Sequence, residues 1–232
     1  MTDVITCSPR DVYYPFWVKQ MNDNRHLFGR VIVVMTQGGD RDYTHYLEDH
    51  LKNVSLITKY PQTGDWRHQA TITALKYVLG DKVLFLEQDF LAEPDFYEKL
   101  NKADDEVIGF WTGNRLHPAC LRVNKSLIDN PDFSVDPDVG DHFYKFTKGL
   151  MEHANVTILE ALGLCFYHLA GLTQNYRLTD NFYQPNQFLT YNQKCLDLDM
   201  PDEWRTLINS ILDKNDFVID KEVSSYFDKC LH

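Results

Sequence analysis

Short apolar runs alternate with longer amphipathic segments along the first ninety residues. Four runs have the length of buried strands: residues 4–7, 31–35, 54–57 and 82–89. The β-branched run at 31–35 is the clearest of them. Three intervening segments have helically spaced apolar positions: residues 12–21, 43–51 and 65–79. This alternation predicts an α/β fold whose largely parallel sheet has helices on both faces.

The second half of the chain is less regular. Its patterns predict strands at 107–111, 121–125, 156–159 and 165–168, a short helix at 126–129 and a longer helix at 142–154. A polar and aromatic loop at 173–193 precedes two short helices, at 202–212 and 222–230. We therefore expect one domain over residues 1–192 and a helical appendage over 193–232, packed on that domain.

The composition of the 232 residues is that of a globular protein, with 44% hydrophobic and 25% charged residues. The five cysteines are far apart and form no CxxC motif, which favours reduced thiols over disulfides or structural zinc. No apolar run approaches the ~20 residues of a membrane span, and the first residues lack the pattern of a signal peptide. We expect a cytoplasmic protein.

The net charge of −11 disfavours nonspecific binding to a polyanion. It does not exclude a local basic groove. The densest basic group in the sequence comprises Arg115, His117, Arg122 and Lys125, with Lys145 and Lys148 beyond it.

The apolar run at 82–89 ends abruptly on Glu87 and Asp89. On an extended backbone residues i and i+2 point to the same side, so the two carboxylates lie together and Gln88 faces the other way. Ligands bind at the carboxyl ends of strands in open α/β sheets, and oxygen donors there suit Mg²⁺ or Mn²⁺. The alternative is a polar turn in which Asp89 caps the next segment.

Three further acidic or imidazole side chains stand at the ends of predicted elements. Asp40 follows the strand at 31–35, Asp141 precedes the helix at 142–154, and His168 ends an apolar strand. Each has a purely structural alternative: a solvated loop carboxylate, a helix N-cap and a core histidine, respectively.

The order of these features resembles that of glycosyltransferases with the GT-A fold, most closely the family 2 enzymes that use nucleotide sugars. The resemblance covers about residues 4–178. Four landmarks carry it: residues 36–40, 64–70 leading into 84–89, 111–114 with 140–142, and 167–173. It implies a Rossmann-like, mostly parallel central sheet. The chain departs from the family at Glu87, where an Asp is usual, and at Gly140, which replaces the first acid of a Glu-Asp pair.

The resemblance also implies the roles of individual residues. The metal ligands are Asp89, His168 and Glu87. The donor is bound by Thr6, Asp40, Arg67, Gln88, Tyr176 and Arg177, the last two in a loop that closes over the donor as a lid. The catalytic base is Asp141, alone or assisted by Asp138. The acceptor groove is lined by Trp66, Trp111 and Arg115.

The implied activity is Mn²⁺- or Mg²⁺-dependent transfer of a sugar from a nucleotide sugar, expected to be a UDP-sugar, to a hydroxyl acceptor. A single base with no second carboxylate favours inversion. The acceptor is a glycan or a hydroxymethylated DNA base. One alternative is a nucleotidyltransferase, although residues 6–10 lack its usual Gly-rich phosphate loop. The other is a non-catalytic nucleotide-binding module.

Overall fold

The computed structural model describes eleven stretches of the chain: residues 1–7, 14–37, 44–52, 56–61, 66–88, 90–92, 95–112, 115–128, 131–132, 143–164 and 166–168. The predicted helices at 202–212 and 222–230, the lid loop and the boundary of the appendage lie outside these residues.

The described residues form strands, α-helices and short 3-10 helices. The strands are β1 (Thr2–Cys7), β2 (Phe28–Gln37), β3 (Leu56–Pro61), β4 (Lys82–Leu86), β5 (Phe90–Ala92), β6 (Val107–Gly109), β7 (Trp111–Thr112), β8 (Arg115–Leu116), β9 (Cys120–Asn124), β10 (Val156–Ile158) and β11 (Phe166–His168). The α-helices are α1 (Tyr14–Asp23), α2 (Thr44–His50), α3 (Trp66–Leu75), α4 (Phe96–Lys102) and α5 (Tyr144–His153). The 3-10 helices are η2 (Arg25–Leu27), η3 (Lys125–Leu127) and η4 (Leu159–Leu162). Among the helices of these stretches, none is long and apolar enough to cross a membrane.

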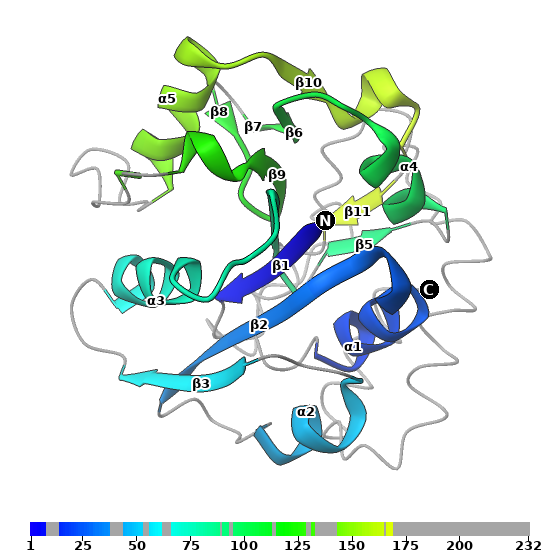
Figure 1. Ribbon diagram of the computed structural model, residues 1–232, viewed down its shortest axis with the longest axis vertical. Coiled ribbons are helices and arrows are strands. Elements are labelled where there is room, and N and C mark those ends of the chain that lie inside the picture. Colours follow the sequence, from blue (N-terminus) through cyan, green and yellow to red (C-terminus); the bar gives the residue numbers. More distant parts are fainter. Residues whose placement is uncertain are drawn as a thin grey trace, which may run out of the picture.

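A seven-stranded sheet in the order β10-β6-β9-β4-β1-β2-β3 forms the centre of the molecule (Figure 1). Strand β9 runs antiparallel to its neighbours β4 and β6, and the other neighbouring pairs are parallel. Two small antiparallel pairs, β5 with β11 and β7 with β8, complete the strand pairing described. The predicted α/β class and the mostly parallel sheet are confirmed.

Hydrophobic cores fill both sides of the sheet. On one side Trp17 of α1, Leu47 of α2 and Leu100 of α4 pack against strand residues such as Leu84. On the other side the residues of α3 and α5 pack against Phe85 and its neighbours. Figure 1 shows α3 and α5 to the left of the sheet and α1 and α4 to its right. The predicted covering of both faces by helices is therefore confirmed.

Several predicted boundaries are wrong. The strand expected at 107–111 is divided, because the backbone N–H of His117 donates to the carbonyl oxygen of Phe110 (2.8 Å) and the chain continues into the β7–β8 pair. The sequence analysis also missed β5, β8 and α4. Helix α4 has seven residues, and it is held by three buried side chains, those of Phe96, Tyr97 and Leu100.

Arg122 is not part of a basic surface, which corrects the group expected around residues 115–125. Its side chain is fully buried on β9. The guanidinium donates to the carbonyl oxygens of Leu100, in the last turn of α4, and of Asp105. Burial lowers the pKa of Arg122. Its charge therefore ties α4 to the sheet and is not available to a ligand.

Candidate active site

The carboxyl ends of β1 and β4 lie side by side, because the two strands pair in parallel with Ile5 opposite Phe85. Just beyond this residue pair, the side-chain amide of Gln88 donates to the hydroxyl oxygen of Thr6 (2.6 Å). Both side chains are buried. This bond fixes the segment after β4 to the end of β1. It favours a supporting role for Thr6 and Gln88, and their direct contact with a donor stays a prediction.

The strand that ends on the two carboxylates is shorter than predicted. Strand β4 stops at Leu86, and Glu87 makes one more bond, from its backbone N–H to the carbonyl oxygen of Ala119 (2.9 Å). The chain then turns at Gln88, and the N–H of Phe90 donates to the carbonyl oxygen of Glu87 (3.3 Å). The expectation of a strand through residue 89 is wrong, because β4 ends at Leu86, β9 begins at Cys120 and Gln88 lies in a turn. The alternative, a polar turn after the strand, is confirmed for the backbone.

The β5–β11 pair brings together two parts of the predicted metal site. Its register places His168 opposite Phe90, Tyr167 opposite Leu91 and Phe166 opposite Ala92. The backbone of His168 therefore lies beside the residue that directly follows Asp89 in the chain. Asp89 itself and the side chain of His168 lie outside the described residues. Nowhere in the described stretches do three or more His, Cys, Asp or Glu side chains gather closely enough to hold a metal ion.

An aromatic cluster fixes both strands of this pair. The rings of Phe90 and Phe166 stack with their centroids 4.9 Å apart. Phe110 lies 4.7 Å from Phe166, and Phe96 of α4 lies 5.5 Å from Phe90. Because these four side chains are fully buried, β5 and β11 are anchored in the core although each has only three residues. The sequence analysis did not single out these phenylalanines.

The predicted acceptor residues Trp111 and Arg115 lie on neighbouring strands of the β7–β8 pair. Trp111 is 39% exposed. The guanidinium carbon of Arg115 lies 5.6 Å from the ring centroid of Tyr144 on α5, and the ammonium of Lys148 lies 5.9 Å from the same centroid. Arg115 and Lys148 thus meet at the ring of Tyr144, which the sequence analysis did not name. Trp111 pairs with Leu116 and Arg115 with Thr112, so Trp111 and Arg115 lie on opposite faces of the β7–β8 pair. The i, i+4 spacing of Tyr144 and Lys148 on the predicted helix was the signal that could have found Tyr144.

The remaining predicted site residues can be placed only in part. Trp66 and Arg67 begin α3 as expected, and their side chains lie outside the described residues. Asp40, Asp141, Tyr176 and Arg177 also lie outside them. The N-cap of α5 is Phe143, so the alternative role of Asp141 as the cap of this helix does not hold.

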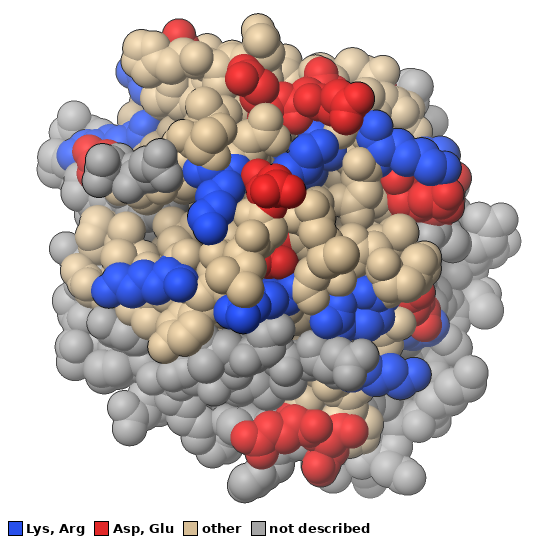
Figure 2. All heavy atoms as spheres, in the orientation of Figure 1, with Lys and Arg blue, Asp and Glu red and all other residues tan. Residues whose placement is uncertain are grey.

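Charged side chains on the described surface are mixed in sign. Figure 2 shows Lys and Arg interspersed with Asp and Glu on the face in view. Among them are the helical i, i+4 pairs Lys99–Asp95 (2.7 Å) and Lys102–Glu98 (2.6 Å). Such exposed pairs contribute little to stability. On the described part of this face, Lys and Arg do not form one continuous patch.

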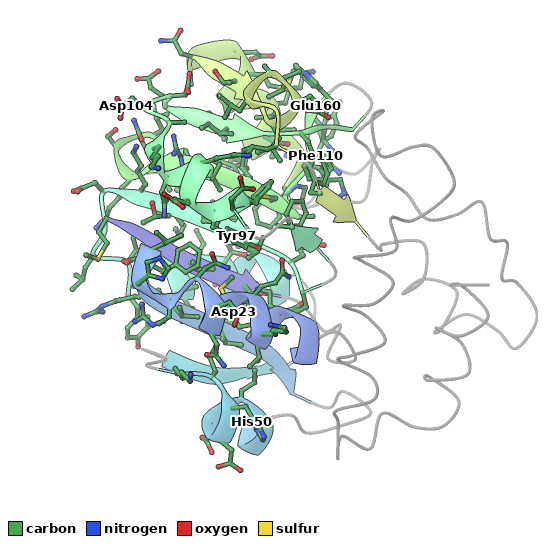
Figure 3. All side chains as sticks on the ribbon, turned by 90° about the vertical axis from the view of Figure 1, so that its right-hand side faces the viewer. Asp23, His50, Tyr97, Asp104, Phe110 and Glu160 are labelled. Carbon is green, nitrogen blue, oxygen red and sulfur yellow. The ribbon has the colours of Figure 1, made fainter. Side chains whose placement is uncertain are left out.

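Among the described residues, the side chains with the most strongly shifted pKa values lie in the core. Burial raises the pKa of the Tyr97 hydroxyl well above its usual range, and it also raises that of the Cys120 thiol. In Figure 3, Tyr97 lies in the interior between Asp23, at the end of α1, and Phe110. These shifts follow from packing, and they do not by themselves indicate a catalytic group.

The strand order and the crossing helices define a GT-A fold, and comparison with solved structures agrees. No protein-family model matches the sequence, and no curated protein matches it. A structure of TarS 1–349 from S. aureus has a TM-score of 0.50 and 14% identity, covering 75% of this chain and 61% of that one. The chain spans only 34% of a longer TarS structure, which has a TM-score of 0.49.

Two other structures are similar at lower scores. Glucosyl-3-phosphoglycerate synthase from Mycobacterium tuberculosis, in complex with Mn²⁺, UDP-glucose and glycerol 3-phosphate, has a TM-score of 0.48 and 13% identity over 68% of this chain and 69% of that one. The inositol-1-phosphate CTP transferase from T. maritima has a TM-score of 0.46 and 9% identity, over 68% and 84%. At these identities the likeness shows the fold alone.

Proposed function

We propose that the chain is a glycosyltransferase that transfers a sugar from a nucleotide sugar bound at the carboxyl ends of β1 and β4. One observation carries the proposal. The β5–β11 register pairs the backbone of His168 with that of Phe90, the residue after Asp89. This pairing supports a metal site that includes Asp89 and His168. The buried Gln88–Thr6 bond supports it, because it closes the same edge of the sheet.

The chemistry of the candidate ligands fits a divalent cation. Asp89 and Glu87 offer carboxylate oxygens, which suit Mg²⁺ and Mn²⁺, and the imidazole of His168 favours Mn²⁺ of the two. Glu87 is partly buried directly after β4. When bound, such a cation neutralises charge on the departing nucleoside diphosphate.

We assign the proton acceptor, the nucleobase contact, the phosphate contact and the lid to residues of the chain. The carboxylate of Asp141 accepts the proton of the acceptor hydroxyl as that oxygen bonds to the anomeric carbon and the bond to the diphosphate oxygen breaks. Asp40 contacts the nucleobase, and Arg67, at the start of α3, binds phosphate with help from the helix N-terminus. Tyr176 and Arg177 close over the donor. With one base and no carboxylate nucleophile, the reaction inverts the anomeric configuration.

The proposed acceptor surface is formed by Arg115, Tyr144 and Lys148. Trp111, on the other face of the β7–β8 pair, and Trp66 are further candidates for contact with the acceptor. An exposed indole suits the face of a sugar ring and also that of a nucleobase. The two cations at the Tyr144 ring permit an anionic acceptor, whereas the net charge of −11 opposes a long polyanion. Both proposed acceptors, a glycan and a hydroxymethylated DNA base, are compatible with these side chains.

The identity of the released product tests the proposal. With Mn²⁺ and a panel of nucleotide sugars, and with water as the acceptor of the sugar, we expect release of a nucleoside diphosphate and free sugar, with a UDP-sugar as the best donor. With a nucleoside triphosphate and a sugar 1-phosphate, we expect no pyrophosphate. Asp89→Ala should abolish the release, and Asp95→Ala, which removes an exposed carboxylate at the start of α4, should not. Pyrophosphate formation would instead identify a nucleotidyltransferase, and no product from either mixture would identify a non-catalytic module.

A further inference from the structure

Gln20 is a buried polar residue of α1 that bonds to the short strand β5. Its side-chain amide nitrogen donates to the carbonyl oxygen of Phe90 (2.8 Å), and its amide oxygen accepts from the backbone N–H of Ala92 (2.9 Å). The hydroxyl of Tyr97 on α4 donates to the same amide oxygen (3.2 Å). All three bonds are buried.

The Gln20 amide takes the place of a neighbouring strand. Alternate residues of a strand direct their backbone groups to the same edge, so Phe90 and Ala92 face Gln20 while Leu91 faces Tyr167 of β11. Strand β5 is thus held on both edges, by β11 on one and by a single side chain on the other. The Tyr97 hydroxyl fixes which end of the amide faces which backbone group.

We propose that Gln20 is a positioning residue for the divalent cation, acting through the backbone of β5 on Asp89 and His168. This inference rests on the proposed function. Phe90 directly follows Asp89 in the chain and its backbone pairs with that of His168, so β5 is the described segment adjoining both proposed ligands. An isolated two-stranded ribbon is marginally stable. Residues that orient metal ligands typically change affinity by about 10- to 100-fold when replaced.

The chain offers a matched control at the opposite end of the sheet. Asp3 of β1 is buried, and its carboxylate accepts from the backbone N–H groups of Arg30 (2.7 Å), Leu79 (2.7 Å) and Gly80 (2.8 Å). Like Gln20, it holds backbone of other segments through a buried polar side chain. Unlike Gln20, it makes no described contact with β5 or β11.

The test measures Mn²⁺ affinity, by the electron paramagnetic resonance of free Mn²⁺, together with stability in urea. Gln20→Met should raise the Mn²⁺ dissociation constant about tenfold. Asp3→Asn should leave that constant within about twofold at a comparable loss of stability. If Gln20→Met does not fold, Gln20→Glu serves, because it keeps the contacts to Ala92 and Tyr97 and places a carboxylate oxygen against the carbonyl oxygen of Phe90 in place of the donor. It should weaken Mn²⁺ binding in the same direction.

The outcomes separate this inference from the function on which it rests. Wild-type Mn²⁺ affinity in the Gln20 variants would overturn the positioning role and leave the proposed glycosyltransferase intact. An equal loss of affinity in Asp3→Asn would also overturn it, because the effect would then follow from lost stability. Absence of Mn²⁺ binding by the wild-type protein would contradict the proposed metal site itself, and the inference with it.

Discussion

Replacing Asp141 by asparagine is expected to lower the rate of sugar transfer about a thousandfold, while donor affinity stays unchanged. A positioned general base typically contributes about 10²- to 10⁴-fold to a rate. Asparagine keeps the shape of the side chain and cannot accept the proton. The measurement is kcat at saturating donor, together with the dissociation constant of the donor from calorimetry.

Asp138 provides the comparison, since it lies three residues earlier in the same acidic segment. If Asp141 acts alone, Asp138→Asn should retain most of the wild-type rate. A large loss in Asp138→Asn with near-normal activity in Asp141→Asn would move the base to Asp138. Loss of donor binding in Asp141→Asn would show that this carboxylate belongs to the donor site.

Replacing Asp3 by alanine should lower the free energy of unfolding by about 4 kcal/mol, the largest stability effect that we expect. The change leaves three backbone N–H groups without their acceptor, and each buried unsatisfied donor costs about 1–3 kcal/mol. The neighbouring glycines show how closely the chain is fitted around this carboxylate, because a Cβ added to Gly29 would collide with its oxygen.

Urea denaturation measures this prediction, with Asp81→Ala as the control. The carboxylate of Asp81 is exposed and pairs with the amino terminus (3.3 Å), so its loss should change the free energy of unfolding by less than about 1 kcal/mol. A change below about 1 kcal/mol in Asp3→Ala would contradict the role assigned to this carboxylate.

The alternation of strands and helices in the first ninety residues could be predicted, because the described side chains of β1, β2 and β4 are mostly buried on both faces. A strand such as β2 then reads as a continuous apolar run in the sequence. The helices of both faces have a clear helical spacing of apolar residues, and α1, α2, α3 and α5 were found with boundaries a few residues in error.

The elements that complete the site could not be predicted, because they depend on partners distant in the sequence. Strand β5 has only three residues, too few to show a period, and it exists as a strand through β11 and Gln20. The buried position of Arg122 could not be predicted either, because its charge suggested a surface position. Its partners are backbone carbonyl oxygens, which no sequence pattern reveals.

The central claim is that a divalent cation near Asp89 and His168 binds the diphosphate of a nucleotide. Thermal stability with a panel of nucleoside diphosphates and nucleotide sugars, with and without Mn²⁺, tests it most directly. We expect stabilisation by one nucleotide that requires Mn²⁺, is lost in Asp89→Ala and persists in Asp95→Ala. If no nucleotide stabilises the wild-type protein in the presence of Mn²⁺, the turn after β4 is a structural turn only, and the catalytic assignments built on it are wrong.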